Sequence, residues 1–431
     1  MKTKRALLIA TAIIALIFIV LMIINLIHYN TGKDEIINTN HMININRGPQ
    51  IWGRSKWTYR FYVEEEASQR ILVSSSLLGR QTEITISEKD GNEIFSESVG
   101  RENREFSDLT LKKGYYTLTI SYKKGPLNHL LFSFEGDEAT FSQQLSENYE
   151  IIPENPEKGF NWKYIIYTPD NLSDNPHILV ETNNTGRPSD DMAVHLNKAI
   201  NDISWKSSFA DKLGSPFIMP VFPRYPDDYD YSHSFDRKTL YTDHQDIQRL
   251  DLQLLAIFED ARERLSAKDI ETADTMLIAG FSSSASFASR FTILHPDRVR
   301  AMAAGAPGGW PIVPVKEYDG KKLRFPIGLY GLEDFLGREI DLNELRNTPL
   351  FFFMGAEDQN DSVVYRDSFD KEDEELIFER FGKTPVERWP AAREIYENAG
   401  MNAKFKLYPD IGHSFSGEMK EDVLNFLKTH Q

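Results

Sequence analysis

The apolar positions near the start of the chain form one long run. Residues 6–24 are apolar apart from one threonine, and Lys2, Lys4 and Arg5 precede them. A run of about 19 residues, at about 1.5 Å rise per residue, approaches the thickness of the hydrocarbon core of a bilayer. The apolar core of a cleaved signal peptide is shorter, and no small-residue cleavage site follows the run. The pattern predicts a transmembrane anchor over residues 1–30, with the basic flank cytoplasmic and the rest of the chain outside.

Apolar and polar residues alternate in the next part of the chain. Residues 59–63, 82–86 and 116–122 each show the two-residue period of a strand, and polar turns separate them. Short alternating strands without a long helix predict a small β-sandwich-like domain over residues 51–148. We expect it to act as a spacer or packing module, or to bind an envelope polymer. Residues 31–50, which are polar and rich in asparagine, are predicted to be a linker.

Beyond the β-domain, apolar runs alternate with amphipathic helices. Strands are predicted at residues 163–167, 177–181, 217–222, 275–279, 299–304, 350–354 and 404–407. Predicted helices include residues 250–265 and 283–294, and a last helix covers residues 422–428. This alternation predicts an α/β fold with a doubly wound, mostly parallel sheet over residues 149–431. Catalytic groups in such folds gather at the carboxyl ends of the strands.

Composition excludes several kinds of chemistry. The chain has no cysteine, so a thiolate nucleophile, a disulfide and a cysteine-bound zinc are all excluded. Its 49 Lys and Arg residues against 65 Asp and Glu residues give a net charge of −16, which argues against a nucleic-acid partner. No pattern indicates a cofactor or a metal site, and none indicates the oligomeric state.

A serine stands at the junction of a predicted strand and a predicted helix. The strand ends at Gly280, Ser282 follows two positions later, and a helix of small residues begins there. A tight strand-to-helix turn exposes the serine hydroxyl and requires small residues two positions before and after it. Gly280 and Ser284 meet this requirement, although the usual pattern has glycine in place of Ser284. Ser283, Ser284 and Ser286 are alternative nucleophiles, and a serine-rich helix N-cap is the structural alternative.

Two later segments supply the partners that a serine nucleophile needs. Asp358 follows a buried apolar strand, and His413 follows another strand before the closing helix. Serine is a weak nucleophile until an adjacent imidazole takes its proton, and a carboxylate orients that imidazole. The chain order of serine, acid and histidine is the one that accompanies a strand-to-helix nucleophile. We therefore predict Ser282 as nucleophile, His413 as general base and Asp358 as orienting acid. Asp361 on the same loop is the alternative acid, ahead of Glu357.

The tetrahedral intermediate of acyl transfer needs hydrogen-bond donors aimed at its oxyanion. The backbone amide of Ser283, directly after the nucleophile, is one predicted donor. The second donor is predicted from the loop at residues 182–187, because asparagine and glycine tolerate turn conformations that expose amides. Asn183 and Asn184 are the candidates in that loop, and a plain turn is the alternative for the same residues.

Four short motifs carry a resemblance to a known family. They are the sequences at residues 280–285, 295–299, 355–358 and 412–415. Through them, the last two thirds of the chain resembles the α/β-hydrolase superfamily, in the branch of secreted bacterial esterases and polyhydroxyalkanoate-depolymerase-like enzymes. The resemblance implies hydrolysis of a carboxylic ester through an acyl-enzyme on Ser282, without a metal or organic cofactor. It does not extend to the β-domain, and Ser284 departs from the family pattern.

Three further groups of residues bear on the substrate. The long stretch at residues 304–345 occupies the position of a lid or cap, in which Trp310 either lines a pocket or anchors the core. Arg224 and Arg237 lie on a predicted loop, where they would meet an anionic substrate group or form internal salt bridges. A set of candidate metal ligands fits no common metal-site spacing and is not predicted to bind metal. This set consists of His233, Asp236, His244 and Asp246.

Three functions are compatible with the sequence. The first is an esterase that acts on a small-molecule or envelope-linked ester outside the cytoplasm. The second is an extracytoplasmic serine peptidase with the same triad, although about 100 residues are too few for the propeller domain of prolyl-oligopeptidase-like enzymes. The third is an inactive hydrolase-fold binding or scaffold protein at the cell envelope. The order of Ser282, Asp358 and His413 favours an enzyme.

Overall fold

The computed structural model describes most of the chain from residue 35 onward. Gaps in this description lie at residues 40–41, 48–52, 64–65, 76–81, 89–90, 100–103, 113, 125–129, 137–147, 185–187, 227–231 and 367. The predicted anchor over residues 1–30 lies outside the described residues. Within them, no helix is long and apolar enough to cross a bilayer. The chain divides into two compact units, Met1–Leu145 and Ser146–Gln431.

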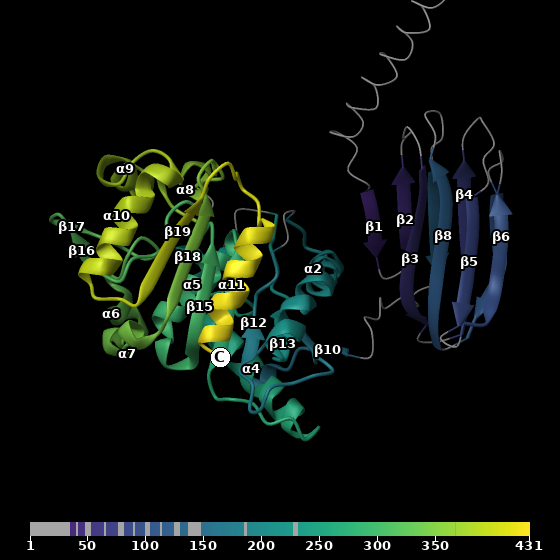
Figure 1. The fold of residues 1–431 in the computed structure, drawn as a ribbon, viewed down its shortest axis with the longest axis horizontal. Helices are drawn as coiled ribbons and strands as arrows, with labels where there is room; N and C mark the ends of the chain where they lie inside the picture. Colours follow the sequence, from purple (N-terminus) through teal and green to yellow (C-terminus); the bar gives the residue numbers. More distant parts are fainter. Residues whose placement is uncertain are drawn as a thin grey trace, which may run out of the picture. The chain divides into compact units, whose positions relative to one another are not determined.

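The first unit contains antiparallel strands in two sheets (Figure 1). One sheet has the order β1-β2-β9-β4-β7, and the other has the order β3-β8-β5-β6. The strands are β1 (Glu35–Thr39), β2 (Met42–Arg47), β3 (Gly53–Val63), β4 (Ala67–Ser75), β5 (Thr82–Glu88), β6 (Glu93–Val99), β7 (Arg104–Leu111), β8 (Gly114–Lys124) and β9 (Leu130–Gly136). Buried side chains of both sheets share one core, in which Ile71 and Val73 of β4 accompany Leu118 of β8. Two sheets with a common core form a small β-sandwich.

Two of these strands fall in the segment that the sequence predicts to be a linker. β1 pairs with β2, and β2 pairs with β9 over its whole length. The linker prediction for residues 31–50 is therefore wrong at these strands. Residues 43–46 alternate isoleucine with asparagine, which is a strand period, but the low strand preference of asparagine obscured it.

An eight-stranded sheet forms the centre of the second unit (Figure 1). Its order is β10-β11-β13-β12-β14-β15-β18-β19. The strands are β10 (Tyr149–Ile152), β11 (Tyr164–Tyr167), β12 (Ile178–Val180), β13 (Phe217–Pro220), β14 (Met276–Phe281), β15 (Val299–Gly305), β18 (Leu350–Gly355) and β19 (Ala403–Tyr408). β11 runs antiparallel to both of its neighbours, and the other pairs are parallel. The seven strands predicted in this part of the chain correspond to β11–β15, β18 and β19.

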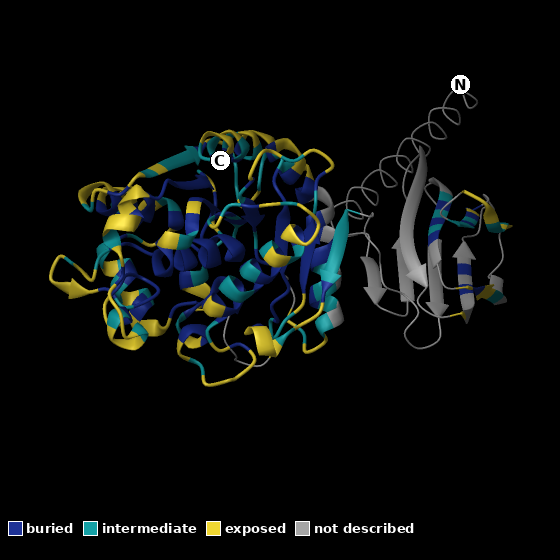
Figure 2. Ribbon diagram, turned by 90° about the horizontal axis from the view of Figure 1, so that it is seen from below, coloured by how far each residue is buried: buried dark blue, intermediate teal, exposed yellow. Residues whose placement is uncertain are grey.

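Helices cover both faces of this sheet. They are α2 (Met192–Leu213), α3 (Arg237–Tyr241), α4 (Leu250–Ser266), α5 (Ser283–Leu294), α6 (Leu332–Leu336), α7 (Leu342–Asn347), α8 (Ser362–Tyr365), α9 (Lys371–Arg380), α10 (Pro385–Asn398) and α11 (Gly417–Thr429). α2 and α11 contact each other over one face, where they enclose Leu179 and Ala279. The adjacent residues Ile178 and Ile278 point to the opposite face and join the core with α4 and α5. Burial on both faces explains the unbroken apolar sequence of the strands (Figure 2).

Candidate active site

The turn between β14 and α5 holds Ser282 in a rare backbone conformation. Its φ is 65° and its ψ is −125°, whereas residues with side chains seldom adopt positive φ. Gly280 makes the turn sterically possible, since a Cβ there would lie 2.4 Å from the carbonyl carbon of Ser284. The backbone N–H of Ser282 donates to Gly305 O at 2.8 Å. The turn therefore projects the Ser282 hydroxyl from the carboxyl end of the sheet.

The structure brings the three predicted triad residues together. His413 Nε2 lies 3.0 Å from Ser282 Oγ. On the other side of the ring, Nδ1 donates to Asp358 Oδ2 at 2.8 Å, because a carboxylate can only accept. The Asp358 side chain is 1% exposed, whereas the His413 side chain is 29% exposed. A buried carboxylate thus orients an imidazole that remains open to a reactant.

The alternative acid, Asp361, has a different role. Its two carboxylate oxygens accept from the guanidinium of Arg388 at 2.8 and 2.9 Å, and that guanidinium is fully buried. Asp361 also caps α8 by accepting from the N–H of Val363 at 3.1 Å. Both partners direct the carboxylate away from His413, so Asp361 is a structural residue. Glu357 is exposed and does not contact His413 among the described hydrogen bonds.

The neighbouring serines differ from Ser282 in their partners. Ser283 Oγ and Ser286 Oγ are buried and form no hydrogen bond within the described part of the chain. Ser284 Oγ accepts from the N–H of Phe281 at 3.0 Å and is 1% exposed. Ser282 is thus the serine in this run whose hydroxyl meets His413. The serine that replaces the usual glycine serves to brace the turn.

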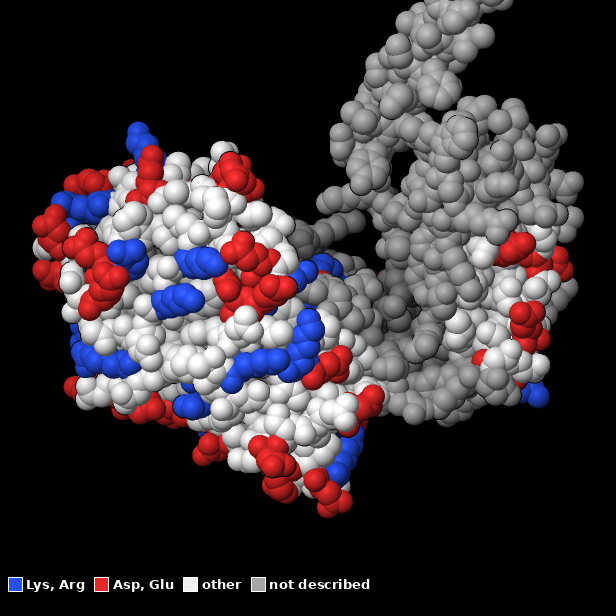
Figure 3. Space-filling model, in the orientation of Figure 1, with Lys and Arg blue, Asp and Glu red and all other residues white. Residues whose placement is uncertain are grey.

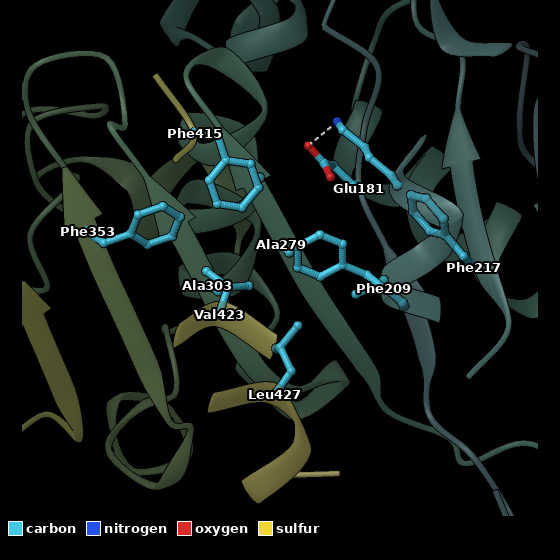
Figure 4. Close-up of a pocket in the computed structure, with 12 residues that line it drawn as sticks. Glu181, Phe209, Phe217, Ala279, Ala303, Phe353, Phe415, Val423 and Leu427 are labelled. Atoms are coloured by element: carbon cyan, nitrogen blue, oxygen red, sulfur yellow. Dashed lines mark hydrogen bonds and ion pairs between the residues drawn. The ribbon is translucent and has the colours of Figure 1, made fainter. Parts of the chain in front are cut away.

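An ion pair that is nearly buried supports the contact of Ser284 with the turn, and no sequence pattern indicated it. Ser284 Oγ lies 3.2 Å from Glu181 Oε1, and Glu181 pairs with Lys206 at 2.5 Å. The side chains of Glu181 and Lys206 are 12% and 11% exposed. Figure 4 shows Glu181, with a dashed line to its ion-pair partner, at the edge of an apolar cavity of about 20 Å³, about the space of one water molecule. No spacing rule links a residue after β12 to one within α2, so the sequence contained no signal for this network.

The predicted oxyanion donors have different environments. The N–H of Ser283 is the first of α5, where a helix offers no internal acceptor. The N–H of Asn183 donates to Pro220 O at 3.2 Å, and its side chain bonds both backbone groups of Phe222. The expectation for Asn183 is therefore corrected, because its N–H continues the pairing of β12 with β13 beyond the end of β12. Asn184 donates from Nδ2 to Phe281 O at 3.4 Å, beside the nucleophile.

The residues weighed as metal ligands have other partners. Nε2 of His233 lies 2.8 Å from Phe222 O, and burial lowers the pKa of His233 to about 3. Asp236 caps α3 by accepting from the N–H of Thr239 at 2.8 Å. Within the described ranges, no group of His, Asp and Glu side chains is arranged to hold a metal ion. His233 instead ties the loop after β13 to the sheet.

The residues considered for substrate contact also have other partners in the structure. Trp310 is fully buried, and its ring stacks on Phe381 with centroids 4.2 Å apart, so it anchors the core. Arg237 forms ion pairs with Asp370 at 2.6 Å and with Asp373 at 2.7 Å. These contacts fix α3 against the start of α9. Lys, Arg, Asp and Glu side chains are interspersed on the face of this unit that Figure 3 shows.

A groove of about 500 Å³ opens beside the loop that carries the triad acid. Its lining includes Asp358, Tyr365, Val364 and Lys383. Tyr365 is 66% exposed and Val364 is 49% exposed, which is unusual for apolar side chains beside a buried carboxylate. The groove therefore presents an amphipathic surface beside Asp358, and Ser282 and His413 are not among its lining residues.

The strand order and the site together define the α/β-hydrolase fold. In this unit the serine turn follows the fifth strand, the acid follows the seventh, and the histidine follows the eighth. The second strand is antiparallel to its neighbours, and the order of the third and fourth is exchanged. Residues 146–431 have this fold, with Ser282 in the strand-to-helix turn after the fifth strand.

Several solved structures are similar to this chain, whereas no family model and no curated protein matches it. A poly(aspartic acid) hydrolase from Sphingomonas sp. KT-1 is 18% identical, with 66% of this chain and 98% of that chain covered and a TM-score of 0.45. The poly(3-hydroxybutyrate) depolymerase LpqC from Bordetella parapertussis is 18% identical, with coverages of 66% and 91% and a TM-score of 0.46. An esterase from Pyrococcus furiosus is 15% identical, with coverages of 65% and 92% and a TM-score of 0.34. These likenesses do not identify the reaction of this chain.

Proposed function

We propose that this protein is a serine hydrolase that cleaves a carboxylic ester through an acyl-enzyme on Ser282. One observation carries the proposal. A serine hydroxyl on a strained turn lies 3.0 Å from an imidazole whose other nitrogen is 2.8 Å from a buried carboxylate. This combination of nucleophile, base and orienting acid has a direct use in acyl transfer.

The proposed reaction proceeds in two halves. Ser282 Oγ attacks the carbonyl carbon while His413 Nε2 takes the hydroxyl proton, and the backbone N–H of Ser283 donates to the oxyanion, with Asn184 as the second donor. The intermediate collapses when Nε2 gives that proton to the departing alcohol oxygen. Water then attacks the acyl carbon, Nε2 takes a water proton, and the proton passes to Oγ as the acid product leaves. Asp358 keeps the ring orientation through both halves.

The substrate class and the location are parts of the same proposal. We propose a small-molecule or envelope-linked ester, because the groove beside Asp358 joins apolar and charged side chains. The apolar run at residues 6–24 would hold the catalytic unit at the outer face of a membrane. No cofactor is part of the proposed reaction, since each proton transfer is served by His413.

Turnover of matched esters and amides by the full-length chain tests the proposal. We expect hydrolysis of short-chain p-nitrophenyl esters, with kcat/KM reduced about 10⁴-fold or more in Ser282→Ala. Ser286→Ala is the matched control, because its hydroxyl is buried without a described partner. Parent-like turnover by Ser282→Ala contradicts the proposed nucleophile. Cleavage of peptide p-nitroanilides in place of the esters would identify a peptidase, and no turnover of either would favour a scaffold protein.

A further inference from the structure

The base of the triad has a second partner in Asn360. Its Nδ2 lies 3.1 Å from His413 Nε2, the same nitrogen that lies 3.0 Å from Ser282 Oγ. The backbone N–H of Asn360 donates to Asp358 Oδ1 at 2.9 Å. The other oxygen of Asp358 accepts from His413 Nδ1. One residue therefore contacts both the acid and the reactive edge of the base.

The ring nitrogen cannot serve two strong donors at once. With its Nδ1 proton committed to Asp358, neutral His413 has one in-plane lone pair on Nε2. The hydroxyl of Ser282 and the amide of Asn360 share that lone pair in the free enzyme. Asn360 also has an acceptor, because rotation of its side-chain amide presents Oδ1 in place of Nδ2. The amide thus suits Nε2 whether the ring is neutral or protonated.

The His413 ring has few other contacts in the described part of the chain. Phe281 lies beside the ring with centroids 5.0 Å apart, and the side chain is 29% exposed. Asp358 is the one ionisable side chain that bonds to His413 among the described residues. Once Ser282 is acylated, Oγ has no proton to donate to Nε2, so the hydroxyl contact is lost. Asn360 is then the described side chain that still reaches this nitrogen.

We propose that Asn360 is a positioning residue that acts mainly in deacylation of the acyl-enzyme. This role for Asn360 rests on the proposed function, since it concerns the second half of that reaction. After Ser282 is acylated, Asn360 Nδ2 donates to Nε2 and keeps the ring in place until water arrives. The side-chain amide then rotates, so that Nε2 is free to accept from the attacking water and Oδ1 accepts a hydrogen bond from one of its protons. The other water proton passes to Nε2 as the water oxygen bonds to the acyl carbon. The bond from that carbon to Oγ then breaks, and Nε2 returns the proton to Oγ.

Burst kinetics with p-nitrophenyl acetate separate the two halves in the full-length chain. For Asn360→Ala we expect deacylation to slow about tenfold, the equivalent of one hydrogen bond to a charged or reacting group, and acylation to slow less than about threefold. The burst amplitude should rise toward one product per active site. Asn402→Ala is the matched control and should behave as the parent, because this exposed asparagine precedes β19, whereas His413 follows the other end of that strand.

A second variant tests the contact with Nε2 through charge. Asn360→Asp places a carboxylate next to Nε2, and an opposite charge at this distance favours the imidazolium. We expect the acid limb of the kcat/KM profile to move about one pH unit upward, which loss of structural support alone would not produce. Denaturation midpoints of both variants verify the fold.

The outcomes of these experiments distinguish two failures. A parent that neither bursts nor turns over contradicts the proposed function. A parent that bursts, with acylation and deacylation changed equally in Asn360→Ala or unchanged in both, overturns the role of Asn360 alone. An unmoved acid limb in Asn360→Asp has the same meaning. Selective slowing of deacylation together with the moved limb supports the proposal.

Discussion

The two sides of the candidate active site are built differently. On the nucleophile side, backbone geometry and burial hold Ser282, since all twelve residues of α5 are buried and Gly280 leaves no room for a Cβ. On the base side, His413 lies on an exposed loop, and side-chain hydrogen bonds from Asp358 and Asn360 determine its position. Packing of the backbone therefore fixes Ser282 and leaves little room for substitution around it, whereas the position of His413 can adjust.

Substitution of two glycines, one on each side of the site, should give the largest difference between the two sides. A Cβ at Gly280 would lie 2.4 Å from backbone, whereas a Cβ at Gly412, next to the base, would meet its nearest atom at 3.9 Å. We expect Gly280→Ala to destabilise the fold by about 3 kcal/mol and to reduce kcat/KM on the order of 100-fold through misplacement of Ser282. Gly412→Ala should leave stability within about 0.5 kcal/mol of the parent. Urea denaturation and ester turnover measure both, and equal effects of the two substitutions would refute the difference.

The ion pair beneath the turn offers a smaller effect on the nucleophile side. Glu181→Gln leaves the ammonium of Lys206 nearly buried without its counter-charge, so we expect a loss of about 2 kcal/mol. Lys206→Met should cost a similar amount because it strands the carboxylate of Glu181. The double variant should recover part of the loss, since neither charge is then unpaired. Additive losses in the double variant would show that the two side chains do not act as a pair.

A buried histidine gives the nucleophile side a dependence on pH. Burial lowers the pKa of His233 from 6.5 to about 3. Between pH 6.5 and about 3, His233 binds a proton in the unfolded chain but stays neutral in the folded chain. Its contribution to the unfolding free energy is therefore complete above pH 6.5 and declines as the pH falls toward 3. The decline approaches about 1.4 kcal/mol per pH unit from this residue. His233→Gln should reduce the dependence of the unfolding free energy on pH between pH 6.5 and 5. An unchanged dependence would contradict this role of His233.

Much of the α/β unit was predictable because it depends on local patterns. Buried parallel strands require unbroken apolar runs, and these identified β14 and β18. β19 at the end of the sheet instead alternates lysine with apolar residues, which is the two-residue period of a strand. The three residues predicted as the triad follow the carboxyl ends of strands in the same sheet, so their order and position in the sequence were enough to predict that they lie close together. Ser282, Asp358 and His413 are indeed brought together by the fold.

The remaining features depend on contacts that no local pattern records. Glu181 and Lys206 meet across a strand and a helix, and Asn360 reaches His413 from a different loop. Asn183 appeared suited to an oxyanion loop by residue type, but its N–H donates to Pro220 O and so continues the pairing of β12 with β13. In the first unit, the high asparagine content favoured the prediction of a linker, although the alternation of isoleucine with asparagine in β2 belongs to a strand. Side-chain direction in loops and pairing between distant segments are tertiary effects.

The central claim is that Ser282 is the nucleophile and that His413 activates it. The most direct test treats the full-length chain with a fluorophosphonate and locates the adduct by peptide mass spectrometry. We expect one adduct on Ser282, no labelling of Ser282→Ala, and labelling of His413→Ala slowed about 10³-fold or more. An adduct on a neighbouring serine, or undiminished labelling of Ser282→Ala, would contradict the account.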